Sequence, residues 1–142
     1  MKRSMPLWRD IEVGSEFAPF VDEPVTRTDI VRYQGASGDF DAAHHDDDHA
    51  RKFGFRGVFS LGMLHGGILA SYACELFDPQ NIRRYRMRFR DIIWVGDRLT
   101  YTAKVTRKYE ENGEHRIDLD LRCQRTADDV PLKAEATFVV PL

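Results

Sequence analysis

The segment spanning residues 61–77 constrains the fold more than any other part of this chain. It carries one acidic residue, Glu75, and no lysine or arginine, and Asp78-Pro79 stops it because proline cannot continue a helix. Apolar residues lie nearly all round the expected helix, which begins near Ser60, so we expect it to be buried. The rest of the chain must therefore supply a layer that covers it.

Small residues recur at every fourth position along this segment, at Gly62, Gly66, Ala70 and Cys74. Residues four apart share one face of a helix, so these four form a continuous stripe. Each interior glycine costs the helix about 1 kcal/mol relative to alanine. The stripe therefore predicts that another element packs very close to this face.

The second half of the chain alternates apolar and polar residues with the period of β-strands. Asn112-Gly113 between two such runs is a strong hairpin signal, and residues 126–129 lead into a last strand. A further short strand is expected in the first half of the chain, over residues 17–21. The predicted fold class is α+β, a single domain over 1–142, in which a curved antiparallel sheet wraps the long helix. The residues expected on the inner face of the sheet are Leu99, Tyr101, Ala103, Val105, Ile117, Leu119, Leu121, Cys123, Leu132, Ala134, Ala136, Phe138 and Val140.

A shorter helix is predicted earlier in the chain, over residues 29–33. Thr28 is its expected N-cap, because a threonine hydroxyl can accept a hydrogen bond from a free backbone N–H of the first turn. Gly35 or Gly38 can end it, since glycine tolerates the left-handed conformation common just past a helix. Asp39 then lies on the loop that follows.

The composition excludes several classes of function. The 142 residues carry a net charge of -2, which gives no electrostatic reason to expect nucleic acid or a membrane surface as a partner. No run of about 18 apolar residues occurs, as a membrane-spanning helix would need. Cys74 and Cys123 lie in separate apolar segments, which disfavours a disulfide framework or a zinc knuckle. We expect a protein of the reducing cytoplasm.

Asp39 and His44 stand five positions apart on the loop, as an acid/base pair would. Taken alone, the pair is more simply a capping aspartate and a surface histidine, since such pairs are only candidates for function. Asp41 lies between them and could orient the His44 imidazole or raise its pKa if it lies close enough.

The acids Asp46, Asp47 and Asp48 follow directly, with histidines nearby, and invite a metal-site interpretation. Consecutive acids at the start of a helix are more simply a cap and a complement to the helix dipole. We therefore expect Asp46 to cap a short helix over residues 47–53, and we expect no metal.

The chain resembles the MaoC-like, type-2 (R)-specific enoyl-CoA hydratase family of hot-dog-fold proteins. The motif of that family consists of an aromatic residue, small residues, Gly-Asp, x-Asn-Pro, x-His and a later small residue. In this chain, residues 33–44 read Tyr-Gln-Gly-Ala-Ser-Gly-Asp-Phe-Asp-Ala-Ala-His, and Ala50 stands at the position of the later small residue. Gly62-Met63-Leu64 matches the Gly-Met-Leu expected at the start of the central helix, and residues 89–97 keep part of a Phe-x-x-Pro-Val-x-x-Gly-Asp segment. Asp41-Ala42 departs from the Asn-Pro of the motif, replacing an amide with a carboxylate that only accepts when ionised.

This resemblance implies a hot-dog fold and the addition of water to a trans-2-enoyl-CoA to give an (R)-3-hydroxyacyl-CoA, or the reverse. Asp39 and His44 would bind and activate the water, and the backbone N–H of Gly62 would hold the enolate-like oxygen. Such an enoyl-CoA hydratase, or 3-hydroxyacyl thioester dehydratase, needs no metal or redox cofactor. Its substrate is the coenzyme A thioester itself, or one carried by an acyl carrier protein.

Two alternatives stay open. A hot-dog acyl-CoA thioesterase would need a carboxylate on the central helix, where Glu75 is the one acid and lies near the far end. The other alternative is a non-catalytic acyl-thioester-binding subunit. The resemblance implies a homodimer or higher oligomer, and the His44-His45-Asp46 run also resembles small hydratase subunits of steroid side-chain degradation, which work in a hetero-oligomer with another hot-dog subunit.

A row of arginines, Arg84, Arg86, Arg88 and Arg90, alternates with aromatic and apolar residues, so a strand would gather the guanidinium groups on one face. Coenzyme A phosphates are one natural partner for this face. A solvated surface or a subunit interface explains it equally well. Phe40 and Met63 are candidate acyl-contacting residues, although core packing would account for both.

Overall fold

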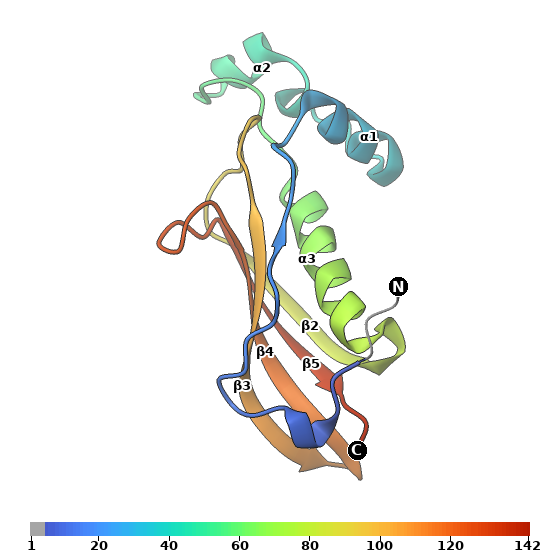
Figure 1. The fold of residues 1–142 in the computed structure, drawn as a ribbon. Helices are drawn as coiled ribbons and strands as arrows, with labels where there is room; N and C mark the ends of the chain where they lie inside the picture. Colours follow the sequence, from blue (N-terminus) through green and yellow to red (C-terminus); the bar gives the residue numbers. More distant parts are fainter. Residues whose placement is uncertain (1–4) are drawn as a thin grey trace.

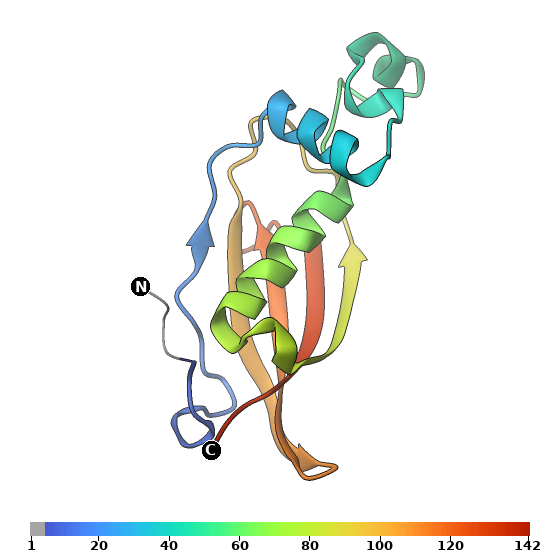
Figure 2. The same ribbon diagram turned by 90° about the vertical axis from the view of Figure 1, so that its right-hand side faces the viewer.

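The computed structural model describes residues 5–142 and contains one antiparallel sheet with the order β1-β3-β4-β5-β2. α3 lies along one face of the sheet, and α1 and α2 lie beyond one end of it (Figures 1 and 2). The α+β class and the antiparallel sheet around a long helix are thus confirmed.

The helices are α1 (Arg27–Ser37), α2 (Asp47–Lys52) and α3 (Gly62–Phe77), with 3-10 turns η1 (Trp8–Asp10), η2 (Ala42–His44) and η3 (Pro79–Asn81). The strands are β1 (Phe20–Val21), β2 (Ile82–Phe89), β3 (Thr100–Glu111), β4 (Glu114–Gln124) and β5 (Leu132–Val139).

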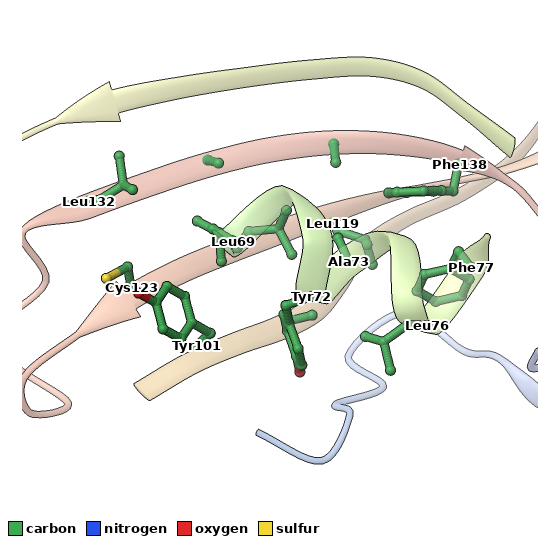
Figure 3. Packing of buried hydrophobic residues seen from close by; sticks show 14 of the residues in the cluster. Leu69, Tyr72, Ala73, Leu76, Phe77, Tyr101, Leu119, Cys123, Leu132 and Phe138 are labelled. Atoms are coloured by element: carbon green, nitrogen blue, oxygen red, sulfur yellow. The ribbon is translucent and has the colours of Figure 1, made fainter. Parts of the chain in front are cut away.

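The core lies between α3 and the concave face of the sheet. Figure 3 shows Leu69, Ala73 and Phe77 of α3 among Leu119 and Phe138 of the strands. Every residue expected on the inner face of the sheet is buried, which confirms the alternation. Burial of each valine, leucine, isoleucine and phenylalanine among them contributes about 1.5–3 kcal/mol.

The expectation that α3 is buried all round was wrong for this chain. Met63, Gly67, Ser71 and Glu75 are exposed, because the sheet covers only one side of the helix and no described segment covers the other. The buried side includes the histidine His65 together with the apolar residues that form the core.

The small-residue stripe of α3 faces β2, as the four-residue spacing predicts. A Cβ added at Gly66 would lie 2.3 Å from Sδ of Met87, and one added at Gly62 would lie 2.8 Å from the ring of Phe89. The hydroxyl of Tyr85 also donates to the carbonyl oxygen of Gly66 at 2.7 Å. The glycines therefore let the strand approach the helix backbone directly.

The hairpin signal is confirmed at Asn112 and Gly113, which join β3 to β4 with φ angles of 54° and 74°. Positive φ at both central residues is the requirement of a type I′ turn. The strand expected over residues 17–21 is shorter, because only Phe20 and Val21 form β1.

The first helix begins two residues earlier than predicted. Thr26, not Thr28, caps α1: its hydroxyl accepts from the Asp29 backbone N–H at 3.1 Å, and the Asp29 carboxylate accepts from the Thr26 N–H at 2.9 Å. This reciprocal capping box requires an acid three residues after the cap, and only Thr26 has one. The helix continues through Gly35 and ends at Gly38, whose φ is 77°.

Neither cysteine of the chain is in a disulfide, and burial raises the pKa of Cys123 to about 12. Among residues 5–142, no helix combines the length and the apolar character needed to cross a membrane.

Candidate active site

The loop between α1 and α2 is held by Gln34, a buried amide on the inner side of α1. Its side-chain N–H₂ group donates to the backbone carbonyls of Asp39 at 3.0 Å and Asp41 at 3.1 Å. Its side-chain oxygen accepts from Nδ1 of His45 at 3.1 Å. Sequence reasoning missed this residue, because a glutamine inside a helix gives no signal until the loop that folds back on it is known.

Asp39 lies at the start of this loop with its carboxylate exposed. Its backbone N–H donates to the Ser37 hydroxyl at 3.2 Å, and Oδ1 accepts from the Asp41 N–H at 3.3 Å. Its second oxygen makes no hydrogen bond or ion pair with residues 5–142. The carboxylate is thus positioned by the backbone and retains an oxygen that can bind a ligand or water.

Asp41 is the N-cap of the turn η2, which ends at His44. Its Oδ1 accepts from the Ala43 backbone N–H at 2.8 Å and does not bond the imidazole. Asparagine and aspartate are both strong N-caps, and proline is favoured at the next position because its φ is pre-set. The Asp41-Ala42 departure from the motif therefore retains the capping oxygen but loses the amide donor and the rigidity of the proline ring.

His44 is oriented by a backbone carbonyl from a distant part of the chain. Nδ1 lies 2.8 Å from the carbonyl oxygen of Phe59, and the imidazole meets the Phe59 ring edge-on with the centroids 4.7 Å apart. A carbonyl can only accept, so Nδ1 carries the proton, and in the neutral ring Nε2 is left as a basic nitrogen. The ring is half-buried and Nε2 has no partner within residues 5–142.

The segment that holds His44 leads directly into α3. Phe59 pairs with Trp94, and the Ser60 N–H donates to the Ile93 carbonyl at 2.8 Å. Gly62 is the first residue of α3, and its N–H meets no acceptor among the described residues. It lies three positions after Phe59 in the chain, so the Cα atoms of Phe59 and Gly62 lie within about 11 Å of each other. The positive end of the helix dipole and this unpaired donor suit a developing negative charge.

A buried hydrogen-bonded chain runs beneath this segment. Nε2 of His65 lies 2.7 Å from the Ser60 hydroxyl, and Nδ1 lies 3.2 Å from the hydroxyl of Tyr101. Burial lowers the pKa of His65 to about 4, against smaller opposing effects of Asp97 and Asp29, so the ring is neutral at pH 7. Burial likewise raises the pKa of Tyr101. His65 had no role assigned from the sequence, and the structure makes it a support for Ser60.

A cavity of about 400 Å³ lies between α1 and α3. Its wall reaches Ala36, three residues before Asp39, and Leu64, two residues after Gly62, but includes neither Asp39 nor His44. The lining mixes apolar and charged residues: Asp22, Glu23, Val25, Asp29, Arg32, Tyr33, Ala36, Leu64, His65 and Ile68.

The remaining candidates are separated from this loop to different degrees. Arg84, Arg86 and Arg88 lie on the outer face of β2, because the alternate residues Met87 and Phe89 face α3. The arginines are therefore on the opposite side of the sheet from the cavity. Phe40 and Met63 are 66% and 52% exposed, so neither belongs to the core.

The acids at the start of α2 act as the sequence predicts. Asp46 caps the helix by accepting from the His49 N–H at 3.0 Å. Asp47 accepts from the Val58 N–H at 2.9 Å and pairs with Arg27 at 2.8 Å, and both contacts lower its pKa. Within residues 5–142 no cluster of three histidine, cysteine or acidic side chains is arranged to hold a metal ion.

Comparison with known proteins agrees with this fold. The (R)-specific enoyl-CoA hydratase of Rhodospirillum rubrum is 26% identical over 136 residues, which cover 94% of this chain and 91% of that protein. The mitochondrial 3-hydroxyacyl-[acyl-carrier-protein] dehydratase of Arabidopsis thaliana is 24% identical over 114 residues, 80% of this chain and 69% of that protein.

Among solved structures, unliganded R-hydratase PhaJ1 from Pseudomonas aeruginosa superposes with a TM-score of 0.78 at 25% identity, covering 95% of this chain and 85% of that one. The ChsH1–ChsH2 complex from Mycobacterium tuberculosis gives a TM-score of 0.72 at 21% identity, covering 91% and 98%. These likenesses show the hot-dog fold. The profile of the MaoC-like domain matches residues 10–123, most of the sequence, and the chain therefore belongs to this family of acyl-thioester hydratases and dehydratases.

Proposed function

We propose that this protein is a hydro-lyase that adds water to a trans-2-enoyl thioester, forming an (R)-3-hydroxyacyl thioester, or catalyses the reverse. The observation that carries the proposal is the hydrogen bond from Nδ1 of His44 to the Phe59 carbonyl, which leaves Nε2 basic on the same loop as the exposed Asp39 carboxylate. A water molecule bound between His44 and Asp39 would donate one hydrogen bond to Nε2 of the imidazole and one to the carboxylate.

In the forward direction Nε2 of His44 removes a proton from this water as its oxygen forms a bond to the β-carbon. The π electrons of the double bond move toward the thioester, giving an enolate whose oxygen accepts from the Gly62 N–H at the start of α3. The α-carbon then takes a proton from the loop's acid/base pair, and the addition of H₂O is complete. Asp39 fixes the water and balances the imidazolium charge that forms.

The acyl chain is proposed to enter the cavity between α1 and α3. Its volume of about 400 Å³ lies in the range of about 300–1,000 Å³ usual for small-molecule sites. Its walls begin within three residues of both Asp39 and Gly62 along the chain. Coenzyme A and an acyl carrier protein are the two proposed carriers of the thioester.

We further propose that the working unit contains more than one hot-dog subunit. Met63 follows Gly62 and is 52% exposed, and Phe40 follows Asp39 and is 66% exposed. Apolar side chains beside both parts of the proposed site suit a surface that a neighbouring subunit covers.

A thioesterase mechanism fits the geometry less well. Glu75 is thirteen residues beyond Gly62 on α3, about 20 Å along the helix axis at about 1.5 Å per residue. A carboxylate at that distance cannot act on a thioester held at the helix start.

The test is hydration of purified enoyl-CoAs of short, long and branched chains, followed by loss of the conjugated thioester absorbance. Asp39→Asn and His44→Ala should abolish most of the activity. Asp48→Asn and His49→Ala, on the neighbouring helix, are the matched controls and should retain it. Equal activity in all five proteins would refute the assignment of Asp39 and His44, and release of free thiol would identify a thioesterase. An inert chain that binds enoyl-CoA would identify a binding subunit.

A further inference from the structure

Arg125, the first residue after β4, directs every nitrogen of its guanidinium group at an acceptor of this chain. Nε and Nη2 donate to the Asp129 carboxylate at 2.7 and 3.2 Å, and Nη2 also donates to the Asp91 carboxylate at 2.5 Å. Nη1 donates to the Asp97 carboxylate at 2.7 Å and to the backbone carbonyl of Ile92 at 2.8 Å. The side chain is only 18% exposed, so water competes little for these contacts.

Three carboxylates therefore share one positive charge, and two of them, Asp91 and Asp97, belong to the β2–β3 loop, residues 91–97. Like charges repel one another, so these acids converge only because the guanidinium stands among them. The hydrogen bond to Asp129 is the largest cause that raises the pKa of Arg125, and the contacts with Asp97 add to it against the opposing effect of burial. The group stays charged, and its planar fork of donors fixes where each acceptor lies.

The β2–β3 loop connects this guanidinium to the contact that orients His44. The Asp97 oxygen that accepts from Arg125 also accepts from the Trp94 backbone N–H at 2.9 Å. Trp94 in turn pairs with Phe59, whose carbonyl oxygen lies 2.8 Å from Nδ1 of His44. A continuous series of hydrogen-bonded groups thus runs from Arg125 to the imidazole.

The same loop holds the chain just before α1. The Val25 N–H donates to the Asp97 carbonyl at 3.0 Å, and the Gly96 N–H donates to the Val25 carbonyl at 2.8 Å. Val25 directly precedes Thr26, the N-cap of α1. Figure 1 shows the β2–β3 loop at the end of the sheet nearest α1 and α2. One loop is therefore joined both to the start of α1, which leads to Asp39, and to the segment that begins α3.

We propose that Arg125 is a positioning residue of the candidate active site. By holding the β2–β3 loop it keeps the Phe59 carbonyl against Nδ1 of His44, and so leaves Nε2 as the free, basic nitrogen. The inference rests on the proposed function, in which His44 is the base, and adds a residue that the reaction needs although it does not touch the substrate. An ion-pair cluster that only stabilised the fold would not change which nitrogen of His44 carries the proton.

Arg125→Lys is the variant that tests this proposal, with Arg122→Lys as its matched control. Lysine keeps a positive charge among the three acids, but its single nitrogen cannot reach all the acceptors of a guanidinium fork. Arg122 lies three residues earlier, on β4, and pairs with Asp120 at 2.8 Å. It makes no hydrogen bond or ion pair with residues 91–97.

The first measurement is steady-state hydration of an enoyl-CoA. Arg125→Lys should lower kcat by about 10- to 100-fold, because small displacements of a reacting group carry penalties of that size. KM should stay nearly unchanged, since the lost alignment matters in the transition state more than in substrate binding. Arg122→Lys should match wild type in both quantities.

The second measurement is ¹⁵N NMR of protein labelled in its histidines, at about pH 8.5, where an ordinary imidazole is neutral. In wild type the two ring nitrogens of His44 should give well-separated shifts, those of a protonated Nδ1 and a bare Nε2. In Arg125→Lys the two shifts should move toward each other, because both tautomers become populated. The signals of His44 are assigned by their absence from the spectrum of His44→Gln.

In an active protein the proposal requires both changes. A fall in kcat without a change of tautomer, or the reverse, overturns it, and so does an Arg125→Lys protein that is merely less stable. A wild-type chain inert toward every enoyl thioester would refute the proposed function, whereas the tautomer would still decide whether Arg125 holds the Phe59 carbonyl. If Arg125→Lys does not fold, Asp97→Asn takes its place in both measurements, since it keeps an oxygen for the Trp94 N–H.

Discussion

The carbonyl oxygen of Phe59 accepts a hydrogen bond from Nδ1 of His44 at 2.8 Å, and this contact links the loop before α2 to the segment that begins α3. It fixes which nitrogen of the imidazole carries the proton. It also connects the proposed base to the helix start that offers the Gly62 N–H. Two parts of the candidate site that lie apart in the sequence are thereby held in one arrangement.

Replacing His44 with alanine should lower kcat by about 10²- to 10⁴-fold, since that is the usual contribution of a general base. His44→Gln, which can still donate to Phe59, should retain the loop structure but not the activity. The measurement is steady-state hydration of an enoyl-CoA beside a thermal unfolding curve. Unchanged kcat in both variants would show that another group activates the water.

Gln34→Ala should destabilise the protein by about 1–3 kcal/mol, because the buried amide satisfies two loop carbonyls and His45. Urea unfolding measures this loss. The same variant should lower kcat, since the loop it holds carries Asp39. Gln80→Ala, at an exposed position on η3, is the control and should change neither quantity. Full activity in Gln34→Ala would show that the loop keeps its geometry without the amide.

The cap of η2 gives a test of the unusual Asp41. Asp41→Asn retains a capping oxygen, so its stability and activity should match wild type. Asp41→Ala should cost about 1 kcal/mol and reduce activity, because the Ala43 N–H loses its acceptor. If Asp41→Asn is as damaging as Asp41→Ala, the negative charge of Asp41 itself is required.

Protonation of His65 should make the protein less stable in acid. The pKa is about 4 in the folded protein against 6.5 for the ordinary group, so the unfolded chain binds the proton first as the pH falls. The contribution of this histidine to the free energy of unfolding is therefore complete above pH 6.5. It is lost as the pH falls toward 4, and the loss amounts to about 3 kcal/mol in total. Urea unfolding at pH 7 and pH 4.5 should show a steeper loss for wild type than for His65→Gln. Parallel losses would assign the acid sensitivity to other groups.

The two neighbouring glycines of α3 should respond to alanine in opposite ways. Gly67→Ala meets no atom within 4 Å and should stabilise the chain by up to about 1 kcal/mol through helix propensity. Gly66→Ala places its Cβ 2.3 Å from Sδ of Met87, so β2 must move and stability should fall by about 1–3 kcal/mol. Thermal unfolding of both variants checks the pair. A stable Gly66→Ala protein would show that the Met87 side chain can move aside without cost.

The general architecture could be predicted because periodic patterns encode which face is buried. The stripe of Gly62 and Gly66 indicated a close contact, and alternation indicated the inner face of each strand; both are local properties of the sequence. The N-cap at Thr26 was missed because Thr26 and Thr28 differ only in which has an acid three residues later. The exposed side of α3 was missed because the apolar composition of a helix does not reveal how many of its sides are covered by other elements.

The titratable candidates for the site could be proposed from the sequence, but the groups that hold them in place could not. Asp39 and His44 stand out because few side chains can move protons. The Phe59 carbonyl could not be found in this way, since every residue has a carbonyl and only the tertiary fold decides which one meets the imidazole. The contact between His65 and Ser60 spans five residues, but its burial depends on Tyr101, far along the chain.

The coverage of β3 by the segment before α1 sets the stoichiometry of any assembly made by extending this sheet. A sheet with two free edges can add subunits at both ends and grow into a fibre. Here the irregular segment 14–22 forms one edge, and its only regular strand is the two-residue β1, so β2 is the long edge from which the described sheet can be extended. Once a single neighbour has joined β2, the remaining edge of the described sheet is this short one, which gives a further strand little to pair with.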